Sequence, residues 1–293
     1  MPLHYGQSNK ISGKRVISFV LASLLLLLAI GVMVAWMIIR FHQNTPPTPS
    51  ENSDTTSQYE DPLTAVDSSL IIFDIENSPR FVLVQTVPAE STVNVAAIPA
   101  NITDEQGNNL PVILAKHGSM KVTQVVSAAL ELPVSHYVTW STDGVQTFLN
   151  ELDSGIVLDL PEAVTYTDEN GITVRLQAGE QNLTGAQAAA VLCFTAWQNP
   201  SLTQTISAQM VAAALNQYLV PDQRLDSYFA ALSDTAQTDL RIDNYNSSRR
   251  VLSHLSEHNT GALCQLVSLL GENRDGRFVP NIDTMKEQSI LYP

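Results

Sequence analysis

Residues 69–98 read SLIIFDIENSPRFVLVQTVPAESTVNVAAI, three apolar segments separated by two short polar turns. The first segment is continuously apolar, as expected for a strand that is buried on both faces. Pro99 follows the third segment and ends it, because proline has no amide hydrogen to donate to a sheet. The predicted strands are Leu70–Phe73, Phe81–Val87 and Thr92–Ile98.

The chain beyond this segment alternates between helical and strand patterns. In Met120–Leu130, apolar residues recur every three or four positions, which is typical of a helix with one buried face. Thr184 and Gln187 have the spacing of a capping box and predict the start of another helix. We also expect strands at His136–Trp140, Ile156–Leu160 and Ile172–Leu176, and helices after Thr142, at Ile206–Leu219 and between Leu225 and Leu270. This alternation predicts an α/β fold, a three-layer sandwich with a mixed, largely parallel central sheet.

A long apolar run precedes this domain. Val16–Ile39 contains 24 residues without a charge, and at about 1.5 Å per residue it can cross a hydrocarbon core of about 30 Å. Lys10, Lys14 and Arg15 come directly before it, so the positive-inside rule places the N-terminus in the cytoplasm. A cleaved signal peptide is the alternative, but its apolar region would be only about 7–15 residues long. We therefore expect an uncleaved transmembrane anchor.

The segment after the run is rich in proline, serine and acidic residues. It cannot bury enough apolar surface to fold alone and predicts a disordered linker. The predicted organisation is a cytoplasmic tail (1–15), a transmembrane anchor (16–39), a linker (40–66) and an extracytoplasmic domain (67–293). The expected location is the cell membrane, with a single pass.

Charge and cysteine content narrow the function classes. Residues 51–293 hold 11 basic and 29 acidic residues, a net charge of −18, which repels nucleic acid at long range. Cys193 and Cys264 form no Cys-x-x-Cys pair, and no histidine lies at zinc-ligand spacing from them. They are either two buried thiols or one disulfide. We predict no nucleic-acid partner and no metal site.

One ordered set of motifs resembles a known family. The segment Gly179–Ala188, GEQNLTGAQA, looks like the Gly-x-x-x-Leu-x-Gly-x-x-Ala segment of the LytR–CpsA–Psr family. Upstream, Val93–Asn101 resembles that family's strand ending in Ile-Pro-Arg-Asp, and Pro133–Pro161 resembles its middle part. The resemblance covers roughly residues 68–270. It implies an α/β sandwich with a deep apolar pocket for a polyprenyl lipid.

The resemblance also implies a chemistry. Family members transfer cell-envelope glycopolymers from a polyprenyl-pyrophosphate lipid to peptidoglycan, using arginines and a Mg²⁺ held by aspartates around the pyrophosphate. Such phosphoryl transfer depends on positioning and on neutralising negative charge. The matching positions of this chain are a degenerate set: Asp74, Arg80, Ala100, Asn101, Cys193, Thr195, Thr205, Ala208 and Gln209.

Most of the charges that the resemblance requires are missing at these positions. Ala100 and Asn101 replace an arginine and an aspartate, and Cys193 and Thr195 replace two arginines. In Thr205–Gln209 only the glutamine of the family's Arg-x-x-Arg-Gln motif remains. The position of the family's second metal-binding aspartate falls near Pro79, where this chain has no aspartate. Only Asp74, with Arg80 nearby, retains a charge. The resemblance therefore implies a non-catalytic member that has a binding or regulatory role in envelope assembly, with polyprenyl lipid or envelope proteins as partners.

Two alternatives remain open at this point. The first is an active transferase, which would need Mg²⁺ and relocated cations that converge on Asp74. The available cations are Arg80, Lys116, His117, Lys121 and Arg175. The second is an unrelated exported α/β binding domain, although the chain has no Gly-x-Ser-x-Gly nucleophile elbow of the kind α/β-hydrolases use.

Overall fold

The computed structural model describes residues 65–75, 78–151, 155–218, 225–258 and 262–293. The predicted cytoplasmic tail and anchor, and almost all of the predicted linker, lie outside these residues. None of the helices within the described ranges combines the length and apolar character needed to cross a bilayer. The predicted strands of residues 69–98 all form.

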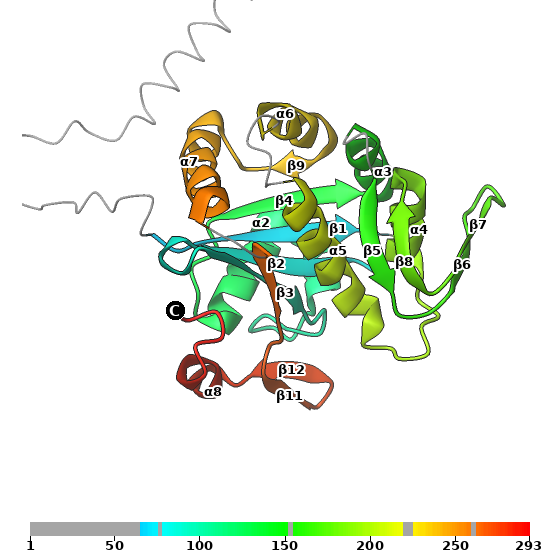
Figure 1. Ribbon diagram of the computed structural model, residues 1–293. Helices are drawn as coiled ribbons and strands as arrows, with labels where there is room; N and C mark the ends of the chain where they lie inside the picture. Colours follow the sequence, from blue (N-terminus) through cyan, green and yellow to red (C-terminus); the bar gives the residue numbers. More distant parts are fainter. Residues whose placement is uncertain (1–64, 76–77, 152–154, 219–224, 259–261) are drawn as a thin grey trace, which may run out of the picture. The chain divides into compact units, whose positions relative to one another are not determined.

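A six-stranded sheet forms the centre of the described domain (Figure 1). Its order is β10-β3-β2-β1-β4-β9. The apolar runs Leu70–Phe73 of β1 and Phe81–Val84 of β2 are explained by burial of both faces of the sheet, because alternate residues of each run belong to different core clusters. The strands are β1 (Asp67–Asp74), β2 (Arg80–Val87), β3 (Thr92–Ile98), β4 (His136–Ser141), β9 (Gln237–Thr238) and β10 (Cys264–Val267).

The sheet is mixed, as predicted, but it is not largely parallel. Among the described strands, β1 pairs with β4 and β10 with β3 in parallel, while the other three neighbouring pairs are antiparallel. The reason is the length of the connections. Only five residues join β1 to β2, and four, including the 3₁₀ turn η1 (Pro88–Glu90), join β2 to β3. A parallel crossover needs about a dozen residues or more, so these strands must turn back.

Helices cover both faces of the sheet, so the predicted three layers are present. On one face lie α2 (Leu110–Leu130) and α8 (Ile282–Glu287), which contact Leu70 and Ile72 of β1. On the other lie α3 (Thr142–Glu151), α4 (Gly185–Cys193), α5 (Leu202–Tyr218), α6 (Leu225–Thr235) and α7 (Ile242–His258). The intervening residues Ile71 and Phe73 face this second layer. Each fully buried side chain of this size contributes about 1.5–3 kcal/mol to stability.

Six shorter strands form hairpin-like pairs outside the central sheet. Two of the strands predicted from sequence, at 156–160 and 172–176, are found here rather than in the core sheet. The antiparallel pairs are β5 (Ile156–Leu160) with β8 (Gly179–Leu183), β6 (Val164–Thr167) with β7 (Thr173–Leu176), and β11 (Gly271–Arg274) with β12 (Arg277–Pro280). The β6–β7 pair extends away from the rest of the domain (Figure 1).

Candidate functional site: a polar cavity beside an apolar cavity

A polar cavity of about 680 Å³ lies where β1 and β4 end. These strands are parallel, with Asp74 opposite Ser141, so their carboxyl ends meet at one edge of the sheet, where ligands bind in many α/β proteins. The Ser141 Oγ accepts a hydrogen bond from Gly144 N at 3.1 Å and caps α3. The residues that characterise the polar cavity are Asp74, Ser141, Thr142, Asp143, Gln146, Tyr166, Asp168, Glu169 and Cys193.

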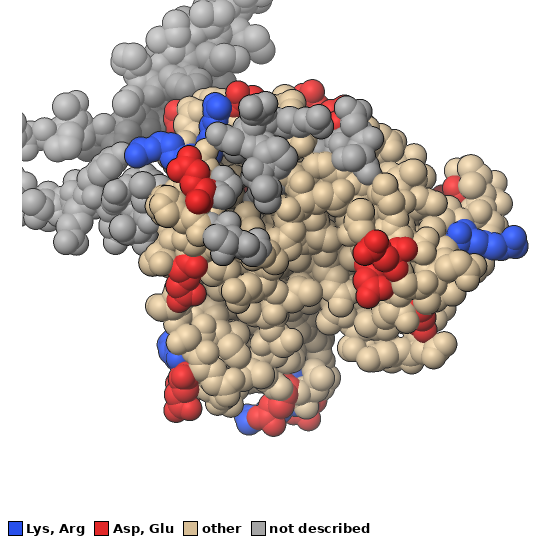
Figure 2. All heavy atoms as spheres, viewed as in Figure 1, with Lys and Arg blue, Asp and Glu red and all other residues tan. Residues whose placement is uncertain are grey.

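The polar cavity is acidic. Four of its lining residues are carboxylates, and among the described residues no lysine, arginine or histidine lines it. Asp168 Oδ1 accepts hydrogen bonds from Asn170 N at 3.0 Å and Ile172 N at 2.8 Å, so this carboxylate shapes the β6–β7 turn. Acidic groups also outnumber basic ones on the face of the molecule in Figure 2. The cavity therefore disfavours an anionic ligand such as a pyrophosphate.

Arg80 is the basic residue among the predicted site positions that could have attracted an anion. It is 3% exposed, and its Nη1 and Nη2 donate to protein groups, whereas its buried Nε has no hydrogen-bond partner among the described residues. Nη1 donates to Ser78 O at 2.5 Å, and Nη2 donates to Leu192 O at 3.3 Å. Burial lowers the pKa of Arg80 to about 10, and a smaller electrostatic interaction with Cys193 opposes this shift. Arg80 thus joins the start of β2 to the end of α4 and does not line the cavity.

Cys193, the last residue of α4, does line the polar cavity. Its Sγ lies 4.0 Å from Thr142 Oγ1. Burial, together with interactions with Cys193, raises the pKa of the Tyr166 hydroxyl to about 12. Both cysteines are free thiols and not a disulfide. Cys264 is buried, as the first of the two alternatives drawn from sequence expected, whereas Cys193 is only partly buried. The resemblance implies an arginine at position 193, but the side chain that lines the cavity there is the small thiol of Cys193, and the charged residues that line the cavity with it are carboxylates.

The structure brings only two of the predicted site residues, Asp74 and Cys193, into the polar cavity. Ala100 is partly buried against the α2 side of the core. Asn101 holds the β11–β12 hairpin: its Nδ2 donates to Asn273 Oδ1 at 2.8 Å and to Gly276 O at 3.1 Å. Neither lines the polar cavity.

The remaining predicted positions lie on or near α5. Thr195 is exposed in the connection after α4, and Thr205 is exposed on α5 with its hydroxyl donating to Ser201 O at 3.2 Å. Ala208 is buried in the core, and Gln209 is partly buried. None of the four lines the polar cavity.

The relocated cations required by an active transferase do not converge on Asp74 within the described residues. Lys116, His117 and Lys121 belong to α2, which packs on the opposite face of the sheet. Arg175 is exposed on β7 and does not line the polar cavity.

Magnesium and pyrophosphate do not fit the residues that are present. Among the described residues, no three or more His, Cys, Asp or Glu side chains are grouped so that they could hold a metal ion. Asp74 is retained, but the position at which the resemblance places a second aspartate falls near Pro79. Mg²⁺ in such sites is usually held by one or two carboxylates together with substrate phosphates, and the acidic cavity repels those phosphates.

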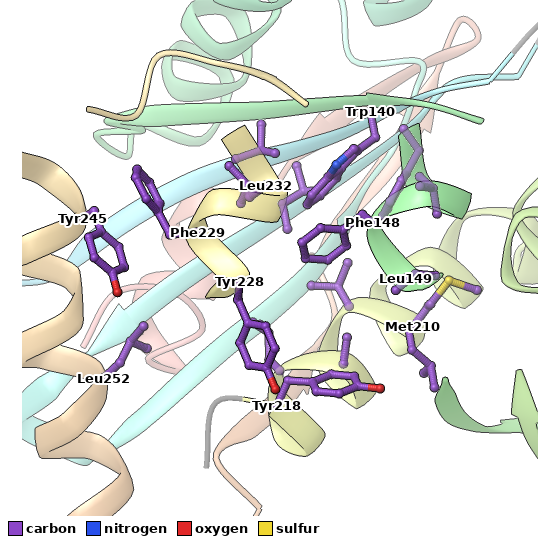
Figure 3. Close-up of a pocket in the computed structure, with 18 residues that line it drawn as sticks. Trp140, Phe148, Leu149, Met210, Tyr218, Tyr228, Phe229, Leu232, Tyr245 and Leu252 are labelled. Carbon is purple, nitrogen blue, oxygen red and sulfur yellow. The ribbon is translucent and has the colours of Figure 1, made fainter. Parts of the chain in front are cut away.

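An apolar cavity of about 250 Å³ lies between the sheet and the helices α3, α5, α6 and α7 (Figure 3). Its floor is formed by side chains of β1 and β4, and its roof by aromatic side chains of α6 and α7. The residues that characterise the apolar cavity are Ile71, Phe73, Val138, Trp140, Phe148, Met210, Ala214, Leu215, Tyr218, Tyr228, Phe229, Leu232, Tyr245 and Leu252.

Three of the polar atoms on the aromatic walls of this cavity donate hydrogen bonds to protein groups. The Tyr218 hydroxyl donates to Gly155 O, and the Tyr245 hydroxyl donates to Asp226. Trp140 Nε1 donates to Thr235 Oγ1 at 3.1 Å. The ring faces that remain are apolar, so the cavity suits a hydrocarbon chain. Its volume is slightly below the range of about 300–1,000 Å³ that is typical of ligand sites.

Sequence reasoning did not identify the polar-cavity residues Ser141, Thr142 and Asp143. A signal existed, because the prediction placed the end of β4 at Trp140 and a helix cap directly after it. Had β4 been paired in parallel with β1, Ser141 would have been placed opposite Asp74. Asp168 and Glu169 come from the β6–β7 turn. The pair Asn170-Gly171 is a hairpin signal in the sequence, but it does not indicate that the turn reaches the polar cavity.

The fold and its cavities define a three-layer α/β protein in which an apolar cavity lies beside a polar one at the strand ends. The LytR–CpsA–Psr family model matches residues 69–273. The chain therefore belongs to this family, whose members include domains related to cell-wall glycopolymer transferases. No curated protein matches the sequence significantly.

Solved structures share the fold at low sequence identity. TagV of Bacillus subtilis is 17% identical, with a TM-score of 0.62 over 76% of this chain and 94% of that chain. TagU of Bacillus subtilis is 15% identical, with a TM-score of 0.52 over 76% and 94%. A transcriptional regulator of Enterococcus faecalis is 16% identical, with a TM-score of 0.62 over 78% and 87%. At these identities the likeness establishes the fold alone.

Proposed function

We propose that this protein is a non-catalytic member of the family, anchored in the cell membrane by residues 16–39, with its domain outside the cytoplasm. It binds the hydrocarbon chain of a polyprenyl lipid and thereby acts as a binding or regulatory component of envelope glycopolymer assembly. Envelope proteins are the expected partners for such a role. The observation that carries the proposal is the acidic polar cavity, which lacks lining cations among the described residues.

The energetic argument concerns the head group. A charge-assisted hydrogen bond contributes about 1.5–3 kcal/mol, and a pyrophosphate site needs several of them. Here the cavity presents Asp74, Asp143, Asp168 and Glu169 instead, while Arg80 is already bonded to Ser78 and Leu192. The apolar cavity supplies about 0.8 kcal/mol for each methylene group it removes from water. Binding is therefore expected to depend on the chain and not on the phosphates.

A transfer assay tests the absence of catalysis. The full chain, reconstituted in lipid nanodiscs, is incubated with a polyprenyl-pyrophosphate-linked oligosaccharide, peptidoglycan and Mg²⁺, and release of the polyprenyl phosphate is followed. We expect the same release from the wild-type chain, from Asp74→Asn and from empty nanodiscs. Release by the wild-type chain that is lost in Asp74→Asn would establish the active-transferase alternative and overturn the proposal.

A further inference from the structure

A third cavity lies on the sheet face that carries the apolar cavity, at the end where β1 and β4 begin. This cavity of about 520 Å³, which we call the His136 cavity, is lined by the first residues of β1 and β4 together with α5 and α7. Its polar wall contains Asp67, Ser69, Ser135, His136, Asn244 and Ser248. The chain enters the domain here, because Ala65 and Val66 also line it. No role in the proposed function has yet been assigned to these residues.

The His136 cavity and the apolar cavity lie end to end. Along β1, Asp67 and Ser69 line the first and Ile71 and Phe73 line the second, all on the same face. Alternate residues of a strand point to one side, so these four side chains form one continuous row. On β4, His136 is likewise followed by Val138 and Trp140.

The helices that face β1 and β4 across the two cavities also connect one cavity with the other. Leu215 of α5 and Leu252 of α7 each line both cavities. From Ser69 to Phe73 the strand advances four residues, which corresponds to about 13 Å. A hydrocarbon chain could therefore run from one cavity into the other along β1.

Aromatic rings line the end of the apolar cavity that faces the polar cavity. Phe73 stacks on Trp140 with their centroids 6.2 Å apart, and Trp140 contacts Phe148 at 5.0 Å. In Figure 3, Trp140 and Phe148 lie together at one end of the site, whereas Leu252 and Tyr245 lie at the other. Among the described residues, none lines both the apolar and the polar cavity. An apolar chain thus has its continuous route toward His136 and not toward Asp74.

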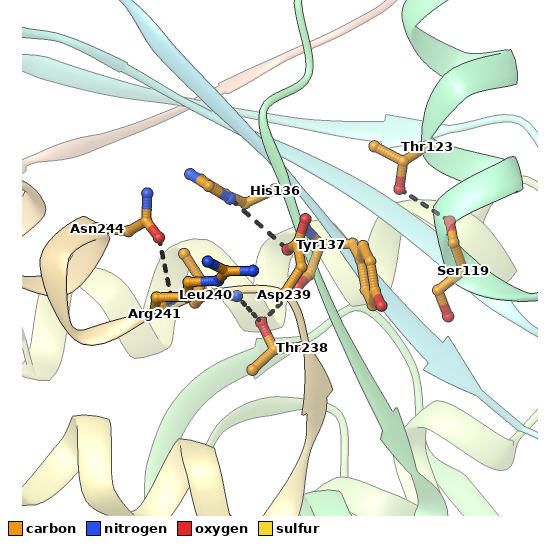
Figure 4. Close-up of polar contacts among 9 residues, drawn as sticks. All are labelled: Ser119, Thr123, His136, Tyr137, Thr238, Asp239, Leu240, Arg241 and Asn244. Carbon is orange, nitrogen blue, oxygen red and sulfur yellow. Dashed lines mark hydrogen bonds and ion pairs between the residues drawn. The ribbon is translucent and has the colours of Figure 1, made fainter. Parts of the chain in front are cut away.

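The groups around His136 select against a charged head group. The imidazole Nδ1 lies 3.6 Å from Asp239 Oδ1 and, among the described residues, has no hydrogen-bond partner (Figure 4). Asp239 is held in place by Tyr137 N, which donates to it at 2.9 Å. A phosphate or carboxylate would approach two carboxylates, Asp67 and Asp239. An uncharged hydroxyl would meet serine hydroxyls, an amide and an imidazole, each able to exchange hydrogen bonds with it.

We propose that this protein binds a long-chain lipid alcohol with its hydroxyl head in the His136 cavity and its tail in the apolar cavity, ending against Trp140. The bound alcohol enters at the end of the domain that carries Ala65 and Val66. This inference rests on the proposed function and specifies its ligand and the ligand's orientation. The head group then lies at the opposite end of the sheet from the polar cavity.

Site-selective fluorescence quenching tests the orientation. The full chain carrying Trp36→Phe and Trp197→Phe, reconstituted in nanodiscs, retains Trp140 as its only tryptophan. Two bromododecanols are titrated, one with bromine at the terminal carbon and one with bromine beside the hydroxyl. Bromine quenches indole fluorescence on contact, so the terminal bromine should quench Trp140 and the bromine beside the hydroxyl should leave it almost unchanged.

Each outcome separates this inference from the proposed function. Stronger quenching by the bromine beside the hydroxyl would place the head at the polar-cavity end and overturn the orientation, while chain binding would stand. Absence of quenching by both probes would overturn the orientation and the proposed chain binding together.

Paired variants provide an independent measurement on the chain with its tryptophans intact. Ser248→Phe fills the His136 cavity, and Gln146→Phe makes a comparable change in the polar cavity. Isothermal titration with dodecanol should show binding weakened about tenfold by Ser248→Phe, equivalent to about 1.4 kcal/mol. Gln146→Phe should bind dodecanol like the wild type. The opposite ranking of the two variants would overturn the inference.

Discussion

Replacing Gly185 with alanine should destabilise the domain by forcing α3 and α4 apart. A Cβ at Gly185 would lie 2.3 Å from the backbone oxygen of Gln146 and 2.6 Å from Asn150 Oδ1. The first of these atoms belongs to the backbone of α3 and cannot rotate away. Relief of the contact requires a separation of about 1 Å, and overpacking of this kind costs about 1–3 kcal/mol. Alanine's helical preference returns at most about 1 kcal/mol.

Because the closest contact is with a backbone atom, we expect a cost in the upper part of this range, about 2–3 kcal/mol. The net loss is then about 1–2 kcal/mol, which lowers the Tm by about 2–8 °C for a domain of this size. Denaturant unfolding followed by circular dichroism measures it. The matched control is Ala186→Ser, the next residue, whose side chain is exposed and whose effect should stay within about 0.5 kcal/mol. If Gly185→Ala is as stable as the control, α3 and α4 do not approach each other as closely as the reasoning requires.

Three further predictions concern the cap of α4, the buried thiol and the apolar cavity. Thr184→Ala removes the hydroxyl that accepts from Gln187 N at 3.4 Å, and should cost about 1 kcal/mol in denaturant unfolding; no loss would show that the capping box is not formed. Burial raises the pKa of the Cys264 thiol to about 12, above an ordinary value of about 8.5. The thiol's contribution to the free energy of unfolding is therefore complete below about pH 8.5 and falls by up to about 1.4 kcal/mol per pH unit as the pH rises toward 12. The stabilities of the wild type and Cys264→Ala, measured by denaturant unfolding over this pH range, should converge, and a constant difference between them would contradict the raised pKa. Ala214→Trp places an indole in the apolar cavity and should weaken dodecanol binding at least about tenfold in a titration; unchanged affinity would mean that the chain binds elsewhere.

The local structure and the mixed character of the sheet could be predicted from the sequence, but the share of parallel strand pairs was overestimated. The capping box at Thr184 and Gln187 forms as expected, with Gln187 Oε1 accepting from Thr184 N at 2.9 Å. Strand existence follows from apolar runs, which are local. Strand direction follows from the length of the connections, and the five residues between β1 and β2 already required an antiparallel turn. The edge strand β10 was not predicted, because it pairs with β3 across a large sequence separation.

The candidate site was less predictable because it is assembled from distant segments. Asp74 could be placed at a strand end, and Cys193 at a helix end, from the ordered motifs. The carboxylates of Asp168 and Glu169 reach the polar cavity through the β6–β7 hairpin, and a hairpin's direction relative to the sheet depends on packing and not on local pattern. The membrane anchor and its topology remain predictions, because they concern residues that the structure does not describe.

Equilibrium binding of a charged and an uncharged polyprenyl lipid tests the central claim most directly. The full chain in nanodiscs is titrated calorimetrically with a polyprenyl pyrophosphate in Mg²⁺ and, in parallel, with the corresponding polyprenol. We predict that the polyprenol binds at least as tightly as the pyrophosphate and that Mg²⁺ has no effect. A Mg²⁺-dependent preference for the pyrophosphate of about tenfold or more, equivalent to about 1.4 kcal/mol, would contradict a site that has lost its head-group chemistry.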